Sequence, residues 1–245
     1  LAELTGITVV ADFRRRDIAA GGQGAPLVPA FHRAQFAAPG IASVIVNIGG
    51  MANVTLVSAE GSVAGWDTGP GNTLMDAWIA RHHDRAFDQA GAWAATGTVI
   101  PQLLEDLLEV PYFKRAAPKS TGPEAFHLDW LQHYLSGGEA AADVQRTLLA
   151  LTVESIAQAI ETTPLTSVRV CGGGAHNTLL MARLAERLRP AEVTTTEAVG
   201  IPPSWVEAAA FAWLAAQTLA GSPGNVPAVT GATAERVLGG IYRGR

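Results

Sequence analysis

Three short segments rich in β-branched residues follow one another closely near the start of the chain, joined by glycine-containing turns. They cover residues 43–47, 53–57 and 62–67. Because turns this short join antiparallel neighbours, we expect three antiparallel strands. Further along, strand-like and helical segments alternate. The expected helices start after Gly71 and cover residues 143–160, 177–188 and 204–219, and the expected strands cover residues 167–171 and 192–196. This order predicts an α/β fold, a mixed sheet with helices on both faces, and excludes a β/α barrel.

The remaining segments are expected to add shorter elements. Residues 1–6 have the pattern of a last helical turn with a glycine stop, and residues 7–13 that of a strand. Several prolines interrupt residues 84–139, which is typical of an insertion with short helices. The helix near the end is almost purely apolar from Ala208 to Ala216, so we expect it to be buried. Since the chain begins in the middle of a pattern, we interpret it as a piece of a longer protein.

Composition excludes several classes of protein. Of the 245 residues, 48% are apolar, which is enough for a core. The formal net charge of −5 argues against nucleic acid or an anionic membrane as a partner. The single cysteine, Cys171, excludes a disulfide framework and a multi-cysteine zinc site. Without a long apolar run or a signal-peptide pattern, the sequence predicts a soluble protein of a reducing compartment, the cytoplasm.

Three glycine clusters follow directly after predicted strands. They are Asn-Ile-Gly-Gly at residues 47–50, Asp-Thr-Gly-Pro-Gly-Asn at residues 67–72 and Cys-Gly-Gly-Gly-Ala-His-Asn at residues 171–177. Open α/β sheets bind ligands at the carboxyl ends of their strands, and glycine lets backbone N–H groups approach a phosphate closely. We therefore expect the clusters to meet in one cleft; the alternative is that each only makes a tight turn. None has the spacing of a dinucleotide fingerprint or a P-loop.

In this order, the three clusters resemble those of the anhydro-N-acetylmuramic acid kinases. Further segments carry the resemblance, which covers essentially the whole chain: residues 12–17, 21–27, 119–122 and 229–232. The resemblance implies a ribonuclease-H-like fold of the actin, hexokinase and Hsp70 superfamily, in which two domains enclose an ATP cleft. It also implies that residues 1–40 are a remnant of the N-terminal domain with a crossover segment. Residues 41–245 would then form the C-terminal domain, with a helical insertion near residues 84–139.

One departure from the family pattern concerns its first phosphate loop. The family begins with a glycine-, serine/threonine- and aspartate-containing loop that has no counterpart in this sequence. We therefore expect this chain alone to be inactive as a kinase.

The resemblance implies a specific reaction. The family uses ATP, with Mg²⁺, to phosphorylate O6 of 1,6-anhydro-N-acetylmuramic acid while water opens the anhydro ring at C1. The product, N-acetylmuramic acid 6-phosphate, belongs to peptidoglycan recycling. Asp67 matches the family's general base, which takes a proton from the water; the alternative is that Asp67 caps the following helix. The implied partners are ATP and the amino sugar, and the resemblance allows a homodimer.

The resemblance also assigns binding roles to residues of the glycine clusters. The nucleotide-binding residues that it implies are Gly49, Gly50, Gly172, Gly173, Gly174 and Asn177. The sugar-binding residues that it implies next to Asp67 are Thr68, Gly69 and Asn72. No metal-binding set of side chains is expected, because the adjacent His82 and His83 point in different directions on a helix and lack a third ligand.

Two charged residues outside the clusters are further candidates. A muramic sugar carries a lactyl carboxylate, which an arginine of residues 14–16 could bind through two N–H groups, and we favour Arg16. The resemblance places Glu207 near the sugar. The alternatives are a solvated arginine surface and a glutamate favoured by the dipole of its helix.

Other functions share parts of this pattern. A sugar- or nucleotide-binding module without catalysis has no need for a water-activating carboxylate at Asp67, and a kinase for another hexose would share the fold. An aspartic protease is the least favoured alternative, because it needs two carboxylates and an all-β fold, whereas Asp-Thr-Gly occurs once, at residues 67–69.

Overall fold

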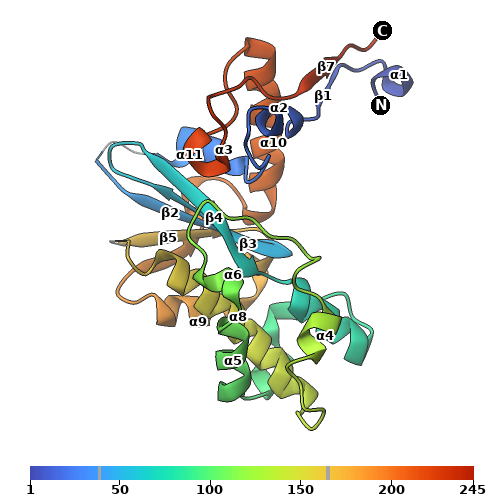
Figure 1. Ribbon diagram of the computed structural model, residues 1–245, viewed down its shortest axis with the longest axis vertical. Coiled ribbons are helices and arrows are strands. Elements are labelled where there is room, and N and C mark those ends of the chain that lie inside the picture. Colours follow the sequence, from blue (N-terminus) through green and yellow to red (C-terminus); the bar gives the residue numbers. More distant parts are fainter. Residues whose placement is uncertain (38–39, 164–165) are drawn as a thin grey trace. The chain divides into compact units, whose positions relative to one another are not determined.

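The computed structural model describes residues 1–37, 40–163 and 166–245. Its main sheet has five strands in the order β4-β3-β2-β5-β6 (Figure 1). They are β2 (Ser43–Ile48), β3 (Met51–Val57), β4 (Val63–Pro70), β5 (Ser167–Cys171) and β6 (Glu192–Thr195). β2 is parallel to β5, with Val44 paired to Val168, and β5 is parallel to β6. Short turns join β2 to β3 and β3 to β4, so these neighbours are antiparallel.

The central strand β2 is covered on both faces. Side chains alternate between the two faces of a sheet, and Val44, Val46 and Ile48 are buried on one face and Ile45 on the other. A strand rich in β-branched residues and buried on both sides is typical of a sheet with parallel pairing. The predicted α/β class with a mixed sheet is confirmed.

Three of the longer helices lie between β4 and β6 in the sequence. They are α4 (Thr73–His83), α8 (Ala141–Ile160) and α9 (Thr178–Arg187). α8 contacts both α4 and α9, and buries apolar residues that recur at helical spacing, such as Leu149, Val153 and Ile156. α9 begins where the Asn177 side chain accepts a hydrogen bond from the backbone N–H of Leu180 at 3.1 Å.

The segment between α4 and α8 consists of short elements. They are η1 (Gln89–Gly91), η2 (Ala94–Thr96), α5 (Pro101–Leu108), α6 (Pro111–Lys114) and α7 (Leu128–Gln132). Pro101 and Pro111 each begin a helix, where the missing N–H group of proline has no intrahelical partner to lose. Short turns further along the chain are η3 (Gly173–His176), η4 (Thr196–Val199) and η5 (Pro203–Trp205).

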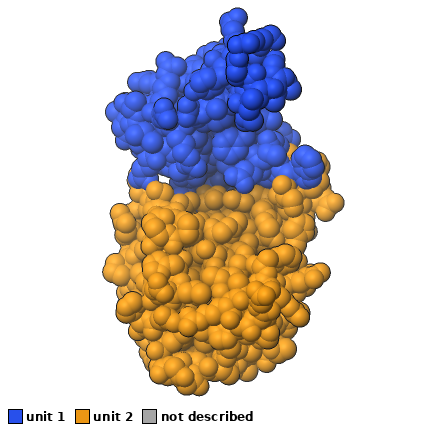
Figure 2. Space-filling model, turned by 90° about the vertical axis from the view of Figure 1, so that its right-hand side faces the viewer, with its two compact units in different colours: residues 1–43, 55–66, 205–245 blue, residues 44–54, 67–204 orange. Residues whose placement is uncertain are grey.

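The chain forms two compact units, coloured blue and orange in Figure 2. Unit 1 contains residues 1–43, 55–66 and 205–245, and unit 2 contains residues 44–54 and 67–204. This division reflects contacts within the chain, and the domain boundary predicted at residues 40 and 41 stays a prediction.

Unit 1 is small and built from segments far apart in the sequence. Its elements besides strand ends of the main sheet are α1 (Ala2–Thr5), β1 (Val9–Ala11), α2 (Arg15–Ala19), α3 (Val28–Phe36), α10 (Val206–Ala220), α11 (Pro227–Thr230) and β7 (Gly240–Tyr242). β1 and β7 pair antiparallel, with Val9 opposite Tyr242. Phe13, Leu214 and Leu238 belong to its core.

One prediction about α10 is wrong. The apolar stretch from Ala208 to Ala216 is not buried as a whole, because only one face of the helix packs inward. Its buried residues are Val206, Ala210, Leu214 and Thr218, while Phe211 is 37% and Leu219 is 61% exposed. The composition misled because alanine, the commonest residue of this helix, favours helices whether or not it is buried.

The described part of the chain contains no helix long and apolar enough to cross a lipid bilayer.

Candidate active site

The tip of the β2–β3 hairpin is bonded to the start of α4. The carbonyl of Gly50 accepts hydrogen bonds from the N–H groups of Gly71 and Thr73 at 2.8 and 3.0 Å, and that of Gly49 accepts one from Asn72 at 2.8 Å. The approach is so close that a Cβ atom on Gly71 would lie 2.4 Å from the Gly49 carbonyl oxygen. Glycine is therefore required at residue 71, and the first two glycine clusters form one piece of structure.

The third glycine cluster reaches the same place from β5. Gly172 has a φ of +81°, and a Cβ atom on it would lie 2.5 Å from Oδ1 of Asn47, at the end of β2. The next residue, Gly173, lies beside the amide of Asn72. The expectation that the three clusters meet is confirmed, and they do so where the parallel strands β2 and β5 end, the usual ligand site of such sheets.

Asp67, on β4, is held in place by the segment after α6. The residue is 9% exposed, and its Oδ2 atom accepts a hydrogen bond from the N–H of Thr121 at 3.0 Å. The hydroxyl of Tyr112 donates to its carbonyl oxygen at 2.7 Å, and its own N–H donates to the carbonyl of Lys119 at 3.2 Å. The carboxylate therefore has a fixed position, as a general base requires.

Lys119 organises the segment that holds Asp67. Its ammonium group donates to the carbonyls of Tyr112 and Phe113 at 3.1 and 3.2 Å and lies 4.8 Å from the centre of the Tyr112 ring. Burial, with the nearby charge of Arg115, lowers the pKa of Lys119. Burial and the charge of Asp67 raise the pKa of Tyr112. Tyr112 thus stays a neutral hydrogen-bond donor to the backbone of Asp67.

The alternative in which Asp67 caps the following helix is wrong. The residue at the start of α4 is Asn72, and the N–H groups there donate to the hairpin carbonyls instead. Of the two neighbours predicted to bind sugar, Thr68 donates its hydroxyl to the carbonyl of Ala52 at 3.3 Å. Gly69 lies against the ring of Phe113.

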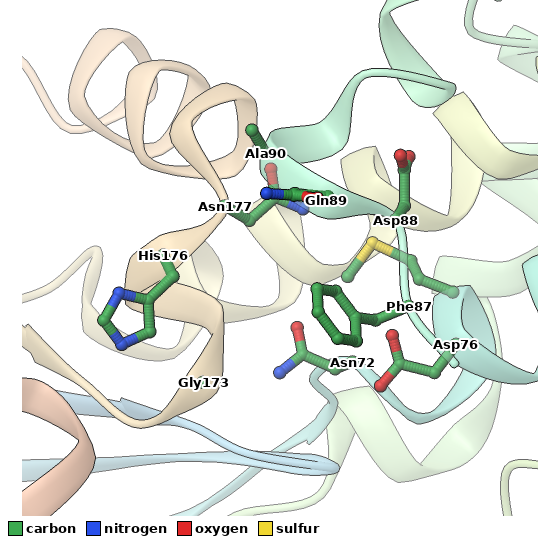
Figure 3. Close-up of a pocket in the computed structure, with 10 residues that line it drawn as sticks. Asn72, Asp76, Phe87, Asp88, Gln89, Ala90, Gly173, His176 and Asn177 are labelled. Carbon is green, nitrogen blue, oxygen red and sulfur yellow. The ribbon is translucent and has the colours of Figure 1, made fainter. Parts of the chain in front are cut away.

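A pocket of about 520 Å³ opens beside the meeting point of the glycine clusters (Figure 3). It lies between the first turn of α4, residues 87–90 and the segment from Gly173 to Asn177. Three residues predicted from the sequence line it, namely Asn72, Gly173 and Asn177. No local pattern indicated the other side, because Phe87 and Asp88 belong to an irregular segment whose position depends on tertiary packing.

Two carboxylates line this pocket and differ in their bonding. Asp88 accepts hydrogen bonds from the N–H groups of Trp93 and Ala94, each at 2.9 Å. Burial, together with the charge of Asp88, raises the pKa of Asp76 to about 6. Among the described residues, no group of three or more His, Cys, Asp and Glu side chains could hold a metal ion.

Comparison with known proteins identifies the family. The family model described as anhydro-N-acetylmuramic acid kinase matches residues 1–244. A protein of Nitrosomonas europaea with that name is 56% identical over 244 residues, which cover 99% of this chain and 67% of the relative. This chain belongs to the anhydro-N-acetylmuramic acid kinase family. Relatives of the same name from Nitrosospira multiformis and Pseudomonas syringae pv. tomato are 55% and 54% identical, with 67% and 68% of their lengths covered.

Solved structures resemble the chain more distantly. The activator of 2-hydroxyisocaproyl-CoA dehydratase from Clostridium difficile with bound ADPNP has a TM-score of 0.44 and 13% identity, covering 74% of this chain and 61% of that one. The ethanolamine utilization protein EutJ from Carboxydothermus hydrogenoformans has a TM-score of 0.40 and 17% identity, covering 74% and 52%.

In this member of the anhydro-N-acetylmuramic acid kinase family, the two other residues predicted to bind the sugar lie in unit 1. Arg16 is exposed and donates from Nη1 to the carbonyl of Val237 at 3.2 Å. Glu207 is exposed in the first turn of α10. Their roles toward the sugar stay predictions.

Unit 1 also contains a buried carboxylate that sequence reasoning missed. Asp17 is fully buried and accepts hydrogen bonds from the N–H of Gly24 at 2.8 Å and from Asn225 and Thr230 at 2.7 Å each. Its position next to three arginines made it look like part of a charged surface, and its partners more than two hundred residues away carry no local signal.

Proposed function

We propose that the protein is an ATP-dependent kinase that phosphorylates O6 of 1,6-anhydro-N-acetylmuramic acid while water opens the anhydro ring at C1. The observation that carries the proposal is the meeting of three glycine clusters where β2 and β5 end, one of them directly after β4, the strand of Asp67, in a chain of this family. The product would be N-acetylmuramic acid 6-phosphate.

The proposed reaction needs one base and one phosphate site. Asp67 takes a proton from water, the water oxygen bonds to C1, and the bond between C1 and O6 breaks. The freed O6 attacks the γ-phosphorus of ATP, and ADP leaves. A fixed carboxylate fits the first role, since a general base must already be positioned when the water attacks.

The phosphate role is supported by two glycines that the protein itself does not require. Gly50 and Gly173 are exposed, and neither has a positive φ. The nearest atoms to a Cβ on them would lie 4.0 and 3.7 Å away, which is ordinary contact. Neither backbone conformation nor packing demands glycine there, so we propose that the missing side chains leave room for phosphate oxygens.

Mg²⁺ would enter with the nucleotide. It usually binds through phosphate oxygens, waters and one or two carboxylates rather than through a protein cage. The described residues, which contain no cluster of three ligands, fit that mode of binding. When bound, the ion would neutralise phosphate charge during the transfer.

The test is turnover in labelled water. With the complete protein, ATP, the anhydro sugar and H₂¹⁸O, we expect one ADP per sugar phosphate, and mass spectrometry should locate ¹⁸O on C1 and phosphate on O6. Label elsewhere would contradict the role of water. Nucleotide and sugar binding without ADP release would favour a binding module, and activity on glucose but not on the anhydro sugar would favour a kinase for another hexose.

A further inference from the structure

The pocket beside the glycine clusters contains a carboxylate that has no hydrogen-bond or ion-pair partner among the described residues. Asp76 is half-buried in the first turn of α4 and lines the pocket. Within residues 1–37, 40–163 and 166–245, its carboxylate accepts no hydrogen bond and joins no ion pair. Groups of this kind normally have a partner, because removing a carboxylate from water without one is unfavourable.

The neighbouring Asp88 does not share this property. Its two carboxylate oxygens are bonded to the N–H groups of Trp93 and Ala94, and Gln145 lies 3.4 Å from one of them. Figure 3 shows its carboxylate pointing away from Asp76. The role of Asp88 is thus to fix the backbone after Phe87, whereas Asp76 is available to a ligand.

Two other side chains define the surroundings of Asp76. Figure 3 shows the amide of Asn72 and the carboxylate of Asp76 close to the ring of Phe87. Phe87 is 60% exposed although its side chain is large and apolar. An exposed ring next to an unpaired acceptor, in a pocket of about 520 Å³, suits a flat heterocycle that also carries hydrogen-bond donors.

We propose that Asp76 recognises the nucleoside half of ATP by accepting hydrogen bonds from its neutral donors. This inference rests on the proposed function, and it adds a specificity-determining residue to it. The donors that ATP offers are the two ribose hydroxyls and the exocyclic amine of adenine. The hydroxyls and the amine belong to the same molecule, and a carboxylate can accept a hydrogen bond from either kind of donor.

The electrostatics of Asp76 agree with such a role. Burial and Asp88 raise its pKa to about 6, so that its charge is unfavourable in the free protein. Carboxylates with a raised pKa at a pocket are typical of binding sites, where the ligand provides the hydrogen-bond donors that the protein lacks. The titratable groups that share the pocket lining are Asp88 and His176.

The experiment compares three nucleotides by titration calorimetry on the complete protein, in the presence of Mg²⁺. ATP has both kinds of donor, inosine triphosphate lacks the amine, and 2′,3′-dideoxy-ATP lacks both hydroxyls. Asp76→Asn keeps the shape but removes the charge, and Asp84→Asn makes the same change at the exposed end of the same helix. Melting curves verify that each variant is folded.

We expect Asp76→Asn to bind ATP about 10-fold or more weakly, the effect of losing a hydrogen bond to a charged group. If the amine is the donor, the substitution will leave binding of inosine triphosphate unchanged. If the ribose is the donor, binding of the dideoxy nucleotide will stay unchanged. Asp84→Asn should bind all three nucleotides as the unchanged chain does.

The inference is overturned if Asp76→Asn binds ATP as tightly as the unchanged chain, or if it weakens all three nucleotides equally. A failure of the proposed function looks different. In that case the complete protein without substitutions binds none of the three nucleotides, and the proposed role of Asp76 is then wrong as well.

Discussion

Asp67 and Asp76 are both carboxylates of unit 2, but they differ in burial and in hydrogen bonding. Asp67 is nearly buried and anchored by Thr121, whereas Asp76 is half-buried and has no hydrogen-bond donor among the described residues. Anchoring suits a base that must hold one position relative to water. The absence of a protein donor suits a group that binds a ligand.

At Asp67, the expected effect is on chemistry alone. In the complete protein, Asp67→Asn keeps an oxygen that can accept from the N–H of Thr121, so the fold should be unchanged and ATP binding should stay within a few-fold. Loss of the base should lower kcat by about 10²–10⁴-fold. Steady-state kinetics of ADP release and calorimetry separate the two quantities. Asp106→Asn, on the exposed face of α5, serves as the control, and an unchanged kcat in Asp67→Asn would remove this residue from the mechanism.

At Asp76, a second prediction concerns stability. Since its pKa is about 6 in the folded protein, against an ordinary value of 3.8, the folded state binds the proton more tightly than the unfolded chain does. Stability from this group is therefore highest below pH 4 and falls as the pH rises to about 6. The full shift corresponds to about 3 kcal/mol, and solvent screening at this half-buried site reduces it to about 1 kcal/mol.

Asp76→Asn should therefore be more stable than the unchanged chain at pH 7 by about 1 kcal/mol and equally stable at pH 4. Urea unfolding at both pH values measures the difference. Asp84→Asn, at the exposed end of the same helix, is measured alongside as the control for the substitution itself. A variant that is less stable at pH 7 would show that the Asp76 carboxylate has a favourable partner in the free protein.

At the scale of elements, the glycine clusters combine two kinds of glycine. Gly71 is required by the hairpin carbonyl that approaches it, whereas Gly50 and Gly173 have room for a methyl group. The first kind builds the site and the second leaves space in it. A sequence cannot distinguish them, because the difference lies in atoms contributed by other segments.

The two kinds predict opposite responses to alanine. Gly71→Ala should lose about 1–3 kcal/mol of stability, because a buried methyl group must displace the hairpin. Gly50→Ala should stay within about 0.5 kcal/mol of the unchanged chain but bind ATP more weakly. Urea unfolding and calorimetry measure both, with Gly138→Ala, an exposed position with free space, as the control. Tight ATP binding by Gly50→Ala would remove the hairpin tip from the phosphate site.

Much of the fold at this scale could be predicted from the sequence. Strands β2 to β6 and helices α4, α8 and α9 carry strong local patterns, and the meeting of the glycine clusters follows from the rule for strand ends. The burial of α10 could not be predicted, since alanine does not show which face packs. The pocket wall at Phe87 and the anchoring of Asp67 by residues 112–121 depend on where an irregular segment folds back.

At the scale of the whole molecule, unit 1 joins the beginning and the end of the chain around Asp17. Its three hydrogen-bond donors come from Gly24, Asn225 and Thr230, and all are bonded to one buried carboxylate. Such a group closes a long loop of chain through a few polar contacts, which are strong where water is excluded.

Asp17→Asn should therefore lose about 2–4 kcal/mol of stability, because the amide presents a donor where the protein already supplies donors. Urea unfolding measures the loss. Asp106→Asn, at the protein surface, should change stability by less than about 0.5 kcal/mol. A stability for Asp17→Asn equal to that of the unchanged chain would mean that these contacts are not important for unit 1.

The three hydrogen bonds between the hairpin tip and the first residues of α4 have one more consequence. They join Gly50 to the helix turn that carries Asp76, so the proposed contact points for the two halves of the nucleotide belong to one rigid body. A nucleotide that uses both proposed contact points would have to match their fixed separation, and one with a phosphate too few would reach only one of them.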